Sequence, residues 1–156
     1  MIAVREARPG DAAAIVPLLN DLGDDHSGED VASRLATLAA TGADPVFVAC
    51  VGERIVGVIG MHLMQPLHVR GRTARIMALS VAVDAQRQGV GRRLIAQAIA
   101  VARQGGCTLL ELTTGMDRTG AQAFYCAQGF EASSLRFRMR LAATAPADTA
   151  PASSRP

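Results

Sequence analysis

Two glycines near the middle of the chain separate an apolar run from an amphipathic one. Gly89 and Gly91 follow strand-like residues 74–83, and from residue 90 to 102 the apolar positions recur at helical spacing. A helix N-terminus has free N–H groups and partial positive charge, so it can hold an anion without a dedicated side chain. Glycine lets such a ligand approach closely because it has no Cβ. Three arginines add cationic charge: Arg87, Arg92 and Arg93.

Two common phosphate-binding patterns are excluded at this turn. A P-loop needs a lysine after its second glycine, and the chain contains no lysine. A dinucleotide fingerprint needs a third glycine where Leu94 stands. What remains is Gln86-x-x-Gly89-x-Gly91, for which a tight turn without a ligand is the alternative interpretation.

A second informative pattern, Ala121-x-x-Phe124-Tyr125-x-x-x-Gly129-Phe130, lies on a short predicted helix that Gly129 ends. Tyr125 is the only tyrosine of the chain. Taken alone, a Phe-Tyr pair on a short helix is typical of core packing.

Together and in this order, the two patterns resemble the coenzyme A pyrophosphate motif and the C-terminal signature of the GNAT N-acetyltransferase superfamily, over residues 1–141. The resemblance implies acetyl-CoA as co-substrate, direct transfer to an amine, and Tyr125 as general acid for the coenzyme thiolate. The implied cofactor-binding residues are Leu79, Ser80, Val81, Gln86, Arg87, Gln88, Gly89, Val90, Gly91 and Arg92. The chain is most similar to enzymes for small amines, the aminoalkylphosphonate and aminoglycoside acetyltransferases, whose Arg before the short helix is matched by Arg118.

The proton acceptor for the amine is left open. In the family the base is often a Glu on the strand before the glycine turn, and Ala78 stands at that position. A water chain, His26, His62 or a loop carboxylate are the candidates.

An acidic segment follows the first predicted helix and contains five carboxylates: Asp21, Asp24, Asp25, Glu29 and Asp30. In GNAT folds the segment between the first two helices lines the acceptor site. Asp24, Asp25 and Glu29 are therefore candidates for binding a small cationic amine, with solvated surface as the alternative. Two other functions are kept: protein N-terminal or lysine acetylation, and a non-catalytic module that binds acetyl-CoA.

Composition favours one globular domain over residues 1–141, followed by an Ala/Pro/Ser/Thr tail at 142–156 that we predict to be disordered. A net charge of +2 does not indicate nucleic acid, and the sequence shows neither a membrane span nor a signal peptide. Three widely spaced cysteines lack a metal-ligand pattern and suggest free thiols in the cytoplasm. Whether the chain forms a homodimer stays open.

The expected fold is α/β (α+β). The resemblance implies a GNAT fold, with a mixed, mostly antiparallel sheet of about six to seven strands and about four flanking helices. Hydrophobic alternation and turn residues predict strands over 2–7, 46–51, 55–61, 74–83, 108–113 and 134–141.

Overall fold

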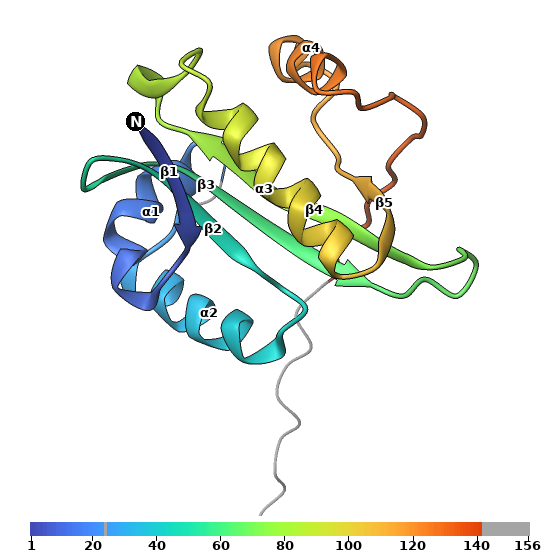
Figure 1. The fold of residues 1–156 in the computed structure, drawn as a ribbon, viewed down its shortest axis with the longest axis horizontal. Coiled ribbons are helices and arrows are strands. Elements are labelled where there is room, and N and C mark those ends of the chain that lie inside the picture. Colours follow the sequence, from blue (N-terminus) through green and yellow to red (C-terminus); the bar gives the residue numbers. More distant parts are fainter. Residues whose placement is uncertain (24, 142–156) are drawn as a thin grey trace, which may run out of the picture.

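A computed structural model describes residues 1–23 and 25–141 of the chain (Figure 1). One five-stranded mixed sheet runs through it in the order β1-β2-β3-β4-β5. The first four strands pair antiparallel with their neighbours, and β5 pairs parallel with β4. Their bounds are β1 Ile2–Glu6, β2 Val46–Val51, β3 Arg54–Met64, β4 Arg72–Val81 and β5 Cys107–Glu111.

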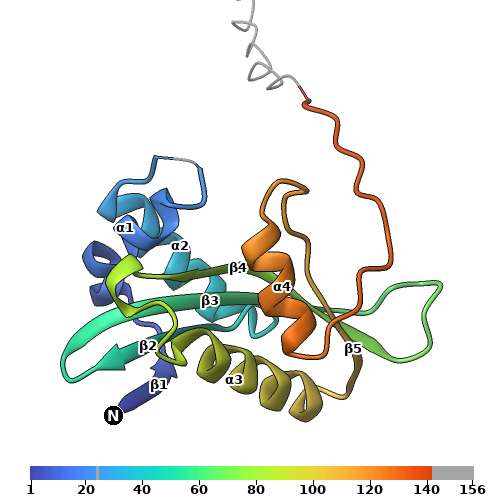
Figure 2. The ribbon, with the colours of Figure 1, turned by 90° about the horizontal axis from the view of Figure 1, so that it is seen from above.

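Helices cover both faces of the sheet (Figures 1 and 2). Helices α1 (Ala12–Asn20) and α2 (Gly28–Thr41) lie on one face and α3 (Val90–Gln104) on the other, while α4 (Thr119–Ala127) lies beside α3. Two short 3-10 helices, η1 (Pro9–Asp11) and η2 (Val83–Ala85), precede α1 and α3. Each face has its own apolar cluster, so the sheet is buried between two layers.

Helix α3 packs closely on the sheet because of its apolar stripe and one glycine of β3. Leu94, Ile95 and Ala98 are fully or almost fully buried. A Cβ at Gly57 would lie 3.0 Å from Val90 Cγ1, so only glycine lets the start of α3 approach β3 this closely. The sheet therefore fixes where α3 begins.

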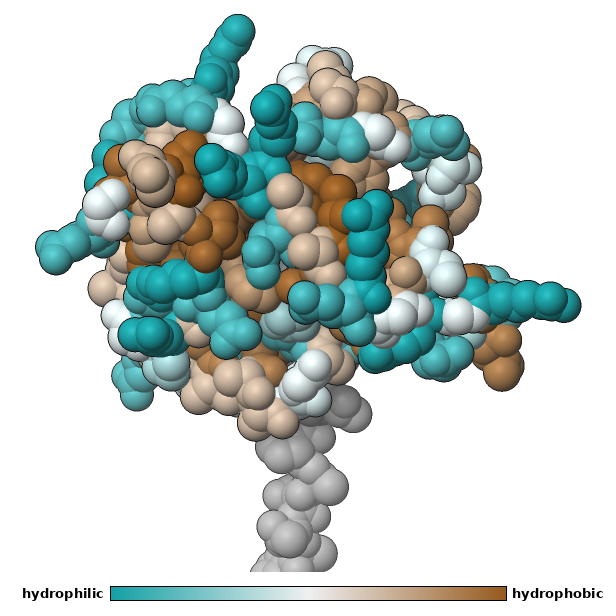
Figure 3. All heavy atoms as spheres, in the orientation of Figure 1, coloured by the Kyte–Doolittle hydropathy of each residue, from teal (hydrophilic) through white to brown (hydrophobic). Residues whose placement is uncertain are grey.

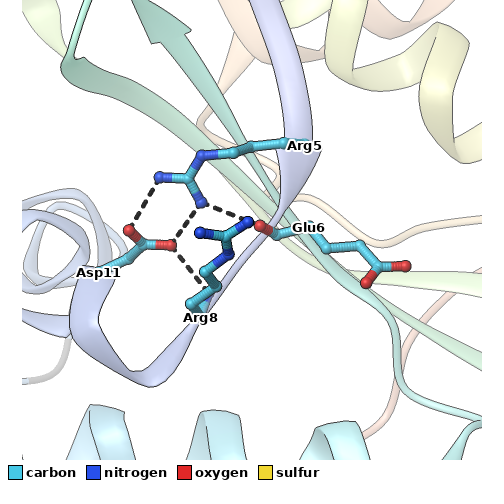
Figure 4. Close-up of polar contacts among 4 residues, drawn as sticks. All are labelled: Arg5, Glu6, Arg8 and Asp11. Carbon is cyan, nitrogen blue, oxygen red and sulfur yellow. Dashed lines mark hydrogen bonds and ion pairs between the residues drawn. The ribbon is translucent and has the colours of Figure 1, made fainter.

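A charged pair ties β1 to the start of α1 (Figure 4). The two terminal nitrogens of Arg5 donate to the Asp11 carboxylate at 2.7 and 2.9 Å, and the backbone N–H of Arg8 donates to the same group at 2.8 Å. Three donors on one carboxylate hold the turn between the strand and the helix.

Helix α2 begins at Gly28, three residues before Val31, its first buried apolar residue. Ser27 caps it, because the Ser27 hydroxyl oxygen accepts from the N–H of Asp30 at 3.1 Å. The Ser27 hydroxyl in turn donates to the Asp30 carboxylate at 2.7 Å. Glu29 and Asp30 therefore belong to the first helical turn and not to the preceding loop.

The prediction of a strand over residues 134–141 is wrong, and with it the prediction of six to seven strands. The described residues form five strands and four α-helices, and residues 131–141 run outside the sheet with every residue exposed. Alternating side chains make a segment suitable for a strand, but a strand also needs a partner edge to pair with. The tail at 142–156, predicted to be disordered, lies outside the described residues.

Candidate active site

The turn between η2 and α3 has a left-handed backbone at two positions. Arg87 has φ 62° and Gly89 has φ 87°, and the first value is uncommon for a residue with a side chain. Ala85 and Val90, both buried, fix the two ends of the turn. The packed ends hold this strained conformation in place.

Backbone donors collect at this turn. Arg93 makes the first helical bond, from its N–H to the carbonyl of Gly89 at 3.1 Å. Within the described part of the chain, the N–H groups of residues 87–92 donate to no protein acceptor. Consecutive unpaired N–H groups at a helix N-terminus form an anion site.

Two groups of side chains surround the turn: glutamines that hydrogen-bond to its backbone and arginines that line a pocket. The amide nitrogen of Gln86 donates to the carbonyl of Val81 at 3.1 Å, and that of Gln88 donates to the carbonyl of Asp84 at 2.8 Å. Both glutamines therefore brace the turn itself. Three cationic side chains line an adjacent surface pocket: Arg87, Arg92 and Arg93. The other residues that line this pocket are Ile2, Gln88, Gly89 and Ala96.

Strands β4 and β5 separate beside this turn. Their pairing covers only Arg72 to Arg75 on β4, opposite Cys107 to Glu111 on β5. Residues 76–81 of β4 have no β5 partner, and Met77 forms a bulge because Gly60 pairs with Ala78 while the next residue of β3 pairs with Ile76. The β5-facing backbone groups of Leu79, Ser80 and Val81 are therefore open to a ligand, except that Gln86 occupies the Val81 carbonyl.

Helix α4, which lies beside α3, carries Tyr125. The Tyr125 ring contacts Phe124 and Phe130 edge to face, with ring centroids 5.3 and 5.9 Å apart. Burial raises the pKa of the Tyr125 phenol above its usual 10, and the nearby Arg118 charge opposes this in part. No hydrogen bond to its hydroxyl occurs among the described residues, so a neutral phenol is available as a proton donor.

The two sequence patterns meet in space at Gly91. A Cβ on this glycine would lie 3.0 Å from Cζ of Phe124, the residue before Tyr125. Gly91 is thus needed for the contact between α3 and α4, a reason that the sequence did not reveal. Gly129 ends α4 with φ 93°, as predicted for a left-handed residue.

His62 and Asp44 form an acid–base pair on the opposite face of the sheet from α3. Nδ1 of His62 lies 2.6 Å from a carboxylate oxygen of Asp44, and the Thr41 hydroxyl donates to the other oxygen at 2.7 Å. The Thr41 hydrogen bond lowers the pKa of Asp44, burial opposes this, and His62 reinforces it. His62 follows Gly60, the partner of Ala78, by two residues, so it lies on the same sheet face as Ala78.

The other candidate bases are less well placed to hold a fixed orientation. His26 is half-buried in the α1–α2 connection, where its backbone N–H donates to the Asn20 side chain at 3.0 Å. The third histidine, His68, was not among the candidates and is exposed in the β3–β4 loop. The partnership of His62 with Asp44 could not be found from the sequence, because the residues are 18 positions apart and share no motif.

The acidic segment is only partly accounted for by helix capping. Asp30 takes part in the Ser27 cap, and Glu29 lies in the first turn of α2, where a negative charge is favourable. Asp25 is exposed in the connection. Asp24, also predicted to bind the acceptor, lies outside the described residues.

Three further properties concern the described ranges 1–23 and 25–141. None of their helices is long and apolar enough to cross a membrane. Their histidine, cysteine and carboxylate side chains form no group of three that could hold a metal ion. The three cysteines are free thiols.

The family model described as acetyltransferase (GNAT) matches residues 15–130. Among curated proteins, aminoalkylphosphonate N-acetyltransferase of Salmonella typhimurium is 36% identical over 87 residues, which are 56% of this chain and 56% of that protein. The alignment thus spans about half the length of this curated relative.

Solved structures extend the likeness over most of the chain. A transcriptional regulator from Bacillus halodurans C-125 is 29% identical, with a TM-score of 0.80, 90% of this chain and 100% of that chain being covered. AAC(6')-Iy in complex with a bisubstrate analogue, CoA-S-monomethyl-acetylneamine, is 18% identical with a TM-score of 0.77 over 90% of this chain and 99% of that one. The similarity to AAC(6')-Iy shows that the two chains share a fold.

Proposed function

Because the chain belongs to the acetyltransferase (GNAT) family of acyl-CoA-dependent enzymes, we propose that it transfers an acetyl group from acetyl-CoA to a primary amine of a small molecule. One observation carries the proposal: the anion-binding turn contacts, through Gly91 and Phe124, the helix that presents Tyr125. Pyrophosphate binding and proton donation are two functions that the transfer needs from the protein, and they lie side by side.

The donor is held along β4 and the glycine turn. The N–H groups of residues 87–92 receive the pyrophosphate, and the arginines beside them add charge. The pantetheine arm lies along residues 79–81 of β4, where β5 no longer pairs. One N–H of this strand polarises the thioester carbonyl and stabilises the negative charge that develops during attack.

Two proton transfers accompany the reaction. The amine nitrogen attacks the thioester carbon, and the C–S bond breaks. His62, oriented by Asp44, accepts the amine proton directly or through one water, which fills the role left open at Ala78. Tyr125 donates its proton to the departing thiolate and regains one from solvent.

The acceptor is a small cationic amine in this proposal. Asp24, Asp25 and Glu29 concentrate negative charge within six residues of the sequence, and such charge attracts a polycation. A second acceptor class, an anionic aminophosphonate, is favoured by the Salmonella relative, which is named for that substrate. The two classes differ in charge and are therefore separable by experiment.

Donor binding is tested by reversing one charge at the turn. Arg92→Glu should weaken acetyl-CoA binding roughly tenfold or more, since a charge-assisted contact contributes about 1.5–3 kcal/mol. The matched control is Arg103→Glu, at the exposed other end of α3, which should bind as the parent does. Unchanged calorimetric affinity in a folded Arg92→Glu variant would place the pyrophosphate elsewhere.

The acceptor is tested by a panel of polyamines, aminoglycosides, aminophosphonates and peptides, with release of the coenzyme thiol as the signal. Replacing Asp24, Asp25 and Glu29 by Asn, Asn and Gln should raise KM for a polyamine at low salt and have less effect at high salt. An aminophosphonate preferred over every cation would overturn the cationic acceptor. Activity only on peptides would indicate protein acetylation, and binding of acetyl-CoA without turnover would indicate a non-catalytic module.

A further inference from the structure

A small cavity lies between α2 and the first two strands, and it shares no lining residue with the arginine pocket at the glycine turn. It is bounded by the end of β1, the last turns of α2 and the residues that lead into β2. Its volume is about 200 Å³, below the roughly 300–1,000 Å³ of pockets for drug-sized ligands, so it fits a molecule of few atoms. Nine residues line it: Glu6, Ala7, Leu35, Leu38, Ala39, Gly42, Asp44, Pro45 and Val46.

The walls of this cavity are largely apolar. Leu35 is buried, and Leu38, Pro45 and Val46 are half-buried. Figure 3 shows apolar surface over α2, the helix that supplies one wall. An alkyl group is favoured against such walls because it leaves water.

Two carboxylates from separate segments give the cavity a negative charge. Glu6 ends β1, and in Figure 4 its carboxylate points away from Arg5, Arg8 and Asp11. Asp44, in the connection between α2 and β2, is 20% exposed and can therefore still be reached by a ligand. Both carboxylates favour a cation in the cavity.

The end of α2 adds to this negative charge. The helix ends at Thr41, followed by Gly42 with φ 66°. Carbonyl groups of the last helical turn carry partial negative charge and attract cations. None of the nine lining residues is basic. Apolar walls with two carboxylates and a helix C-terminus together fit a small ammonium ion that bears an alkyl group.

Asp44 connects this cavity to the proposed base. One of its oxygens lies 2.6 Å from Nδ1 of His62, and the other accepts from the Thr41 hydroxyl at 2.7 Å. An ammonium ion beside Asp44 would compete for the oxygen that orients the imidazole. A ligand in the cavity can therefore act on the base without contacting it.

We propose that this cavity binds a small primary alkylammonium ion, and that the bound ion slows acetyl transfer by weakening the orientation of His62. The binding follows from the cavity alone, whereas the effect on the rate rests on the proposed function. Because the acceptor is also an amine, a small acceptor slows its own acetylation at high concentration.

Binding is tested by titrating the full chain with n-butylammonium and following the methyl resonances of Leu35 and Leu38 by NMR. The dissociation constant should be on the order of 1 mM for a ligand of so few atoms. The neutral isostere n-butanol should need a several-fold higher concentration. Equal binding of n-butanol, or methyl resonances that do not shift, would overturn the site.

Three variants locate the ligand. Ala39→Phe places a large side chain at a lining position and should abolish the methyl shifts. Ala40→Phe is the matched control, because Ala40 is equally exposed on α2 and does not line the cavity. Glu6→Gln should weaken binding by up to about fivefold, as expected of a partly exposed ion pair. Parental binding in both Ala39→Phe and Glu6→Gln would show that the cavity is not the site.

The effect on the rate is tested by thiol release with the best acceptor of the panel, at increasing n-butylammonium. The added ion should lower kcat in the parent and in Ala40→Phe, while Ala39→Phe should keep the parental kcat without inhibition. An increase in KM alone would mean that n-butylammonium competes at the acceptor site, and the effect through Asp44 would be wrong. If the chain released no thiol with any acceptor, the proposed function would fail, and the methyl shifts would still decide the binding.

Discussion

The regions before and after residue 106 differ in how completely their side chains are buried. Every fully buried side chain of the described residues lies between Ala12 and Ala102, whereas residues 107–141 contribute only half-buried and exposed ones. The first region therefore completes its two apolar clusters by itself. The second region, which carries Tyr125, rests on the first through a few aromatic contacts.

This difference follows from how each region is connected to the sheet. Strands β2, β3 and β4 have strand neighbours on both sides, while β5 has one neighbour and pairs only with the first four residues of β4. The same short pairing opens the gap beside Leu79, Ser80 and Val81. In the proposed binding mode, the pantetheine arm therefore enters where the sheet is least complete.

We expect the largest effect, a loss of kcat, from a substitution in the less buried region after residue 106. Tyr125→Phe removes only the hydroxyl, so kcat should fall by a factor on the order of 10² to 10⁴ while acetyl-CoA affinity stays near that of the parent. Steady-state thiol release and calorimetry measure the two quantities. Because burial raises the pKa of Tyr125, the parent should retain its acid up to strongly alkaline pH. A Phe variant with the parental rate would rule out the acid role.

The second prediction compares one leucine from each region. Leu94→Ala should lower the free energy of unfolding by about 2–5 kcal/mol, because Leu94 is completely buried in the core. Leu110→Ala, at a half-buried position of β5, should cost less than half as much. Urea unfolding of the full chain measures both free-energy changes. Equal costs would show that the two regions are equally well packed.

The third prediction tests the base in the well-packed region. His62→Gln should lower kcat/KM by about 10². Asp44→Asn should have a smaller effect, because it removes the orientation of the imidazole and leaves the ring in place. Acetyl-CoA affinity should not change in either variant. A His62→Gln variant with the parental kcat/KM would show that another group accepts the amine proton.

The smallest prediction concerns the pair of Arg5 and Asp11. The hydrogen bond from Arg5 lowers the pKa of Asp11 below 3.8, burial opposes this, and the Arg8 N–H reinforces it. Its stabilisation is therefore present above about pH 4 and is lost as the pH falls through the lower, folded-state pKa. Arg5 is 39% exposed, so the contribution at neutral pH is at most about 1 kcal/mol.

Urea unfolding of Asp11→Asn and the parent should differ at pH 7 and converge in strong acid. The control is Asp84→Asn, which removes the fully exposed pair with Arg54 and should leave the free energy of unfolding unchanged. A pH-independent difference for Asp11→Asn would contradict an electrostatic origin.

Local patterns made much of this fold predictable. The glycine turn and α3 depend on residues within one short stretch, so periodicity and turn chemistry indicated them correctly. The start of α2 at Gly28 is set by the Ser27 cap and not by the first buried apolar residue, Val31. The prediction of a strand at 134–141 was wrong because alternation of polar and apolar residues specifies which face is buried but not which strand pairs with it.

The site was predictable only where its residues lie in motifs. Residues 87–92 and Tyr125 came from patterns in the sequence, and their roles stay predictions. The pair of Asp44 and His62 joins a loop to a strand, and the bracing by Gln86 and Gln88 uses backbone carbonyls, so no spacing signalled either.

The contact between Gly91 and Phe124 links the two roles that we propose, pyrophosphate binding and proton donation, to one position. Any side chain at residue 91 would displace Phe124, and Tyr125 is its neighbour in the chain. In the proposed mechanism, a substitution there would weaken acetyl-CoA binding and misplace the Tyr125 hydroxyl together, so neither loss could be assigned from it. A redesign of this enzyme for another acyl donor would therefore have to change the glycine turn and α4 together.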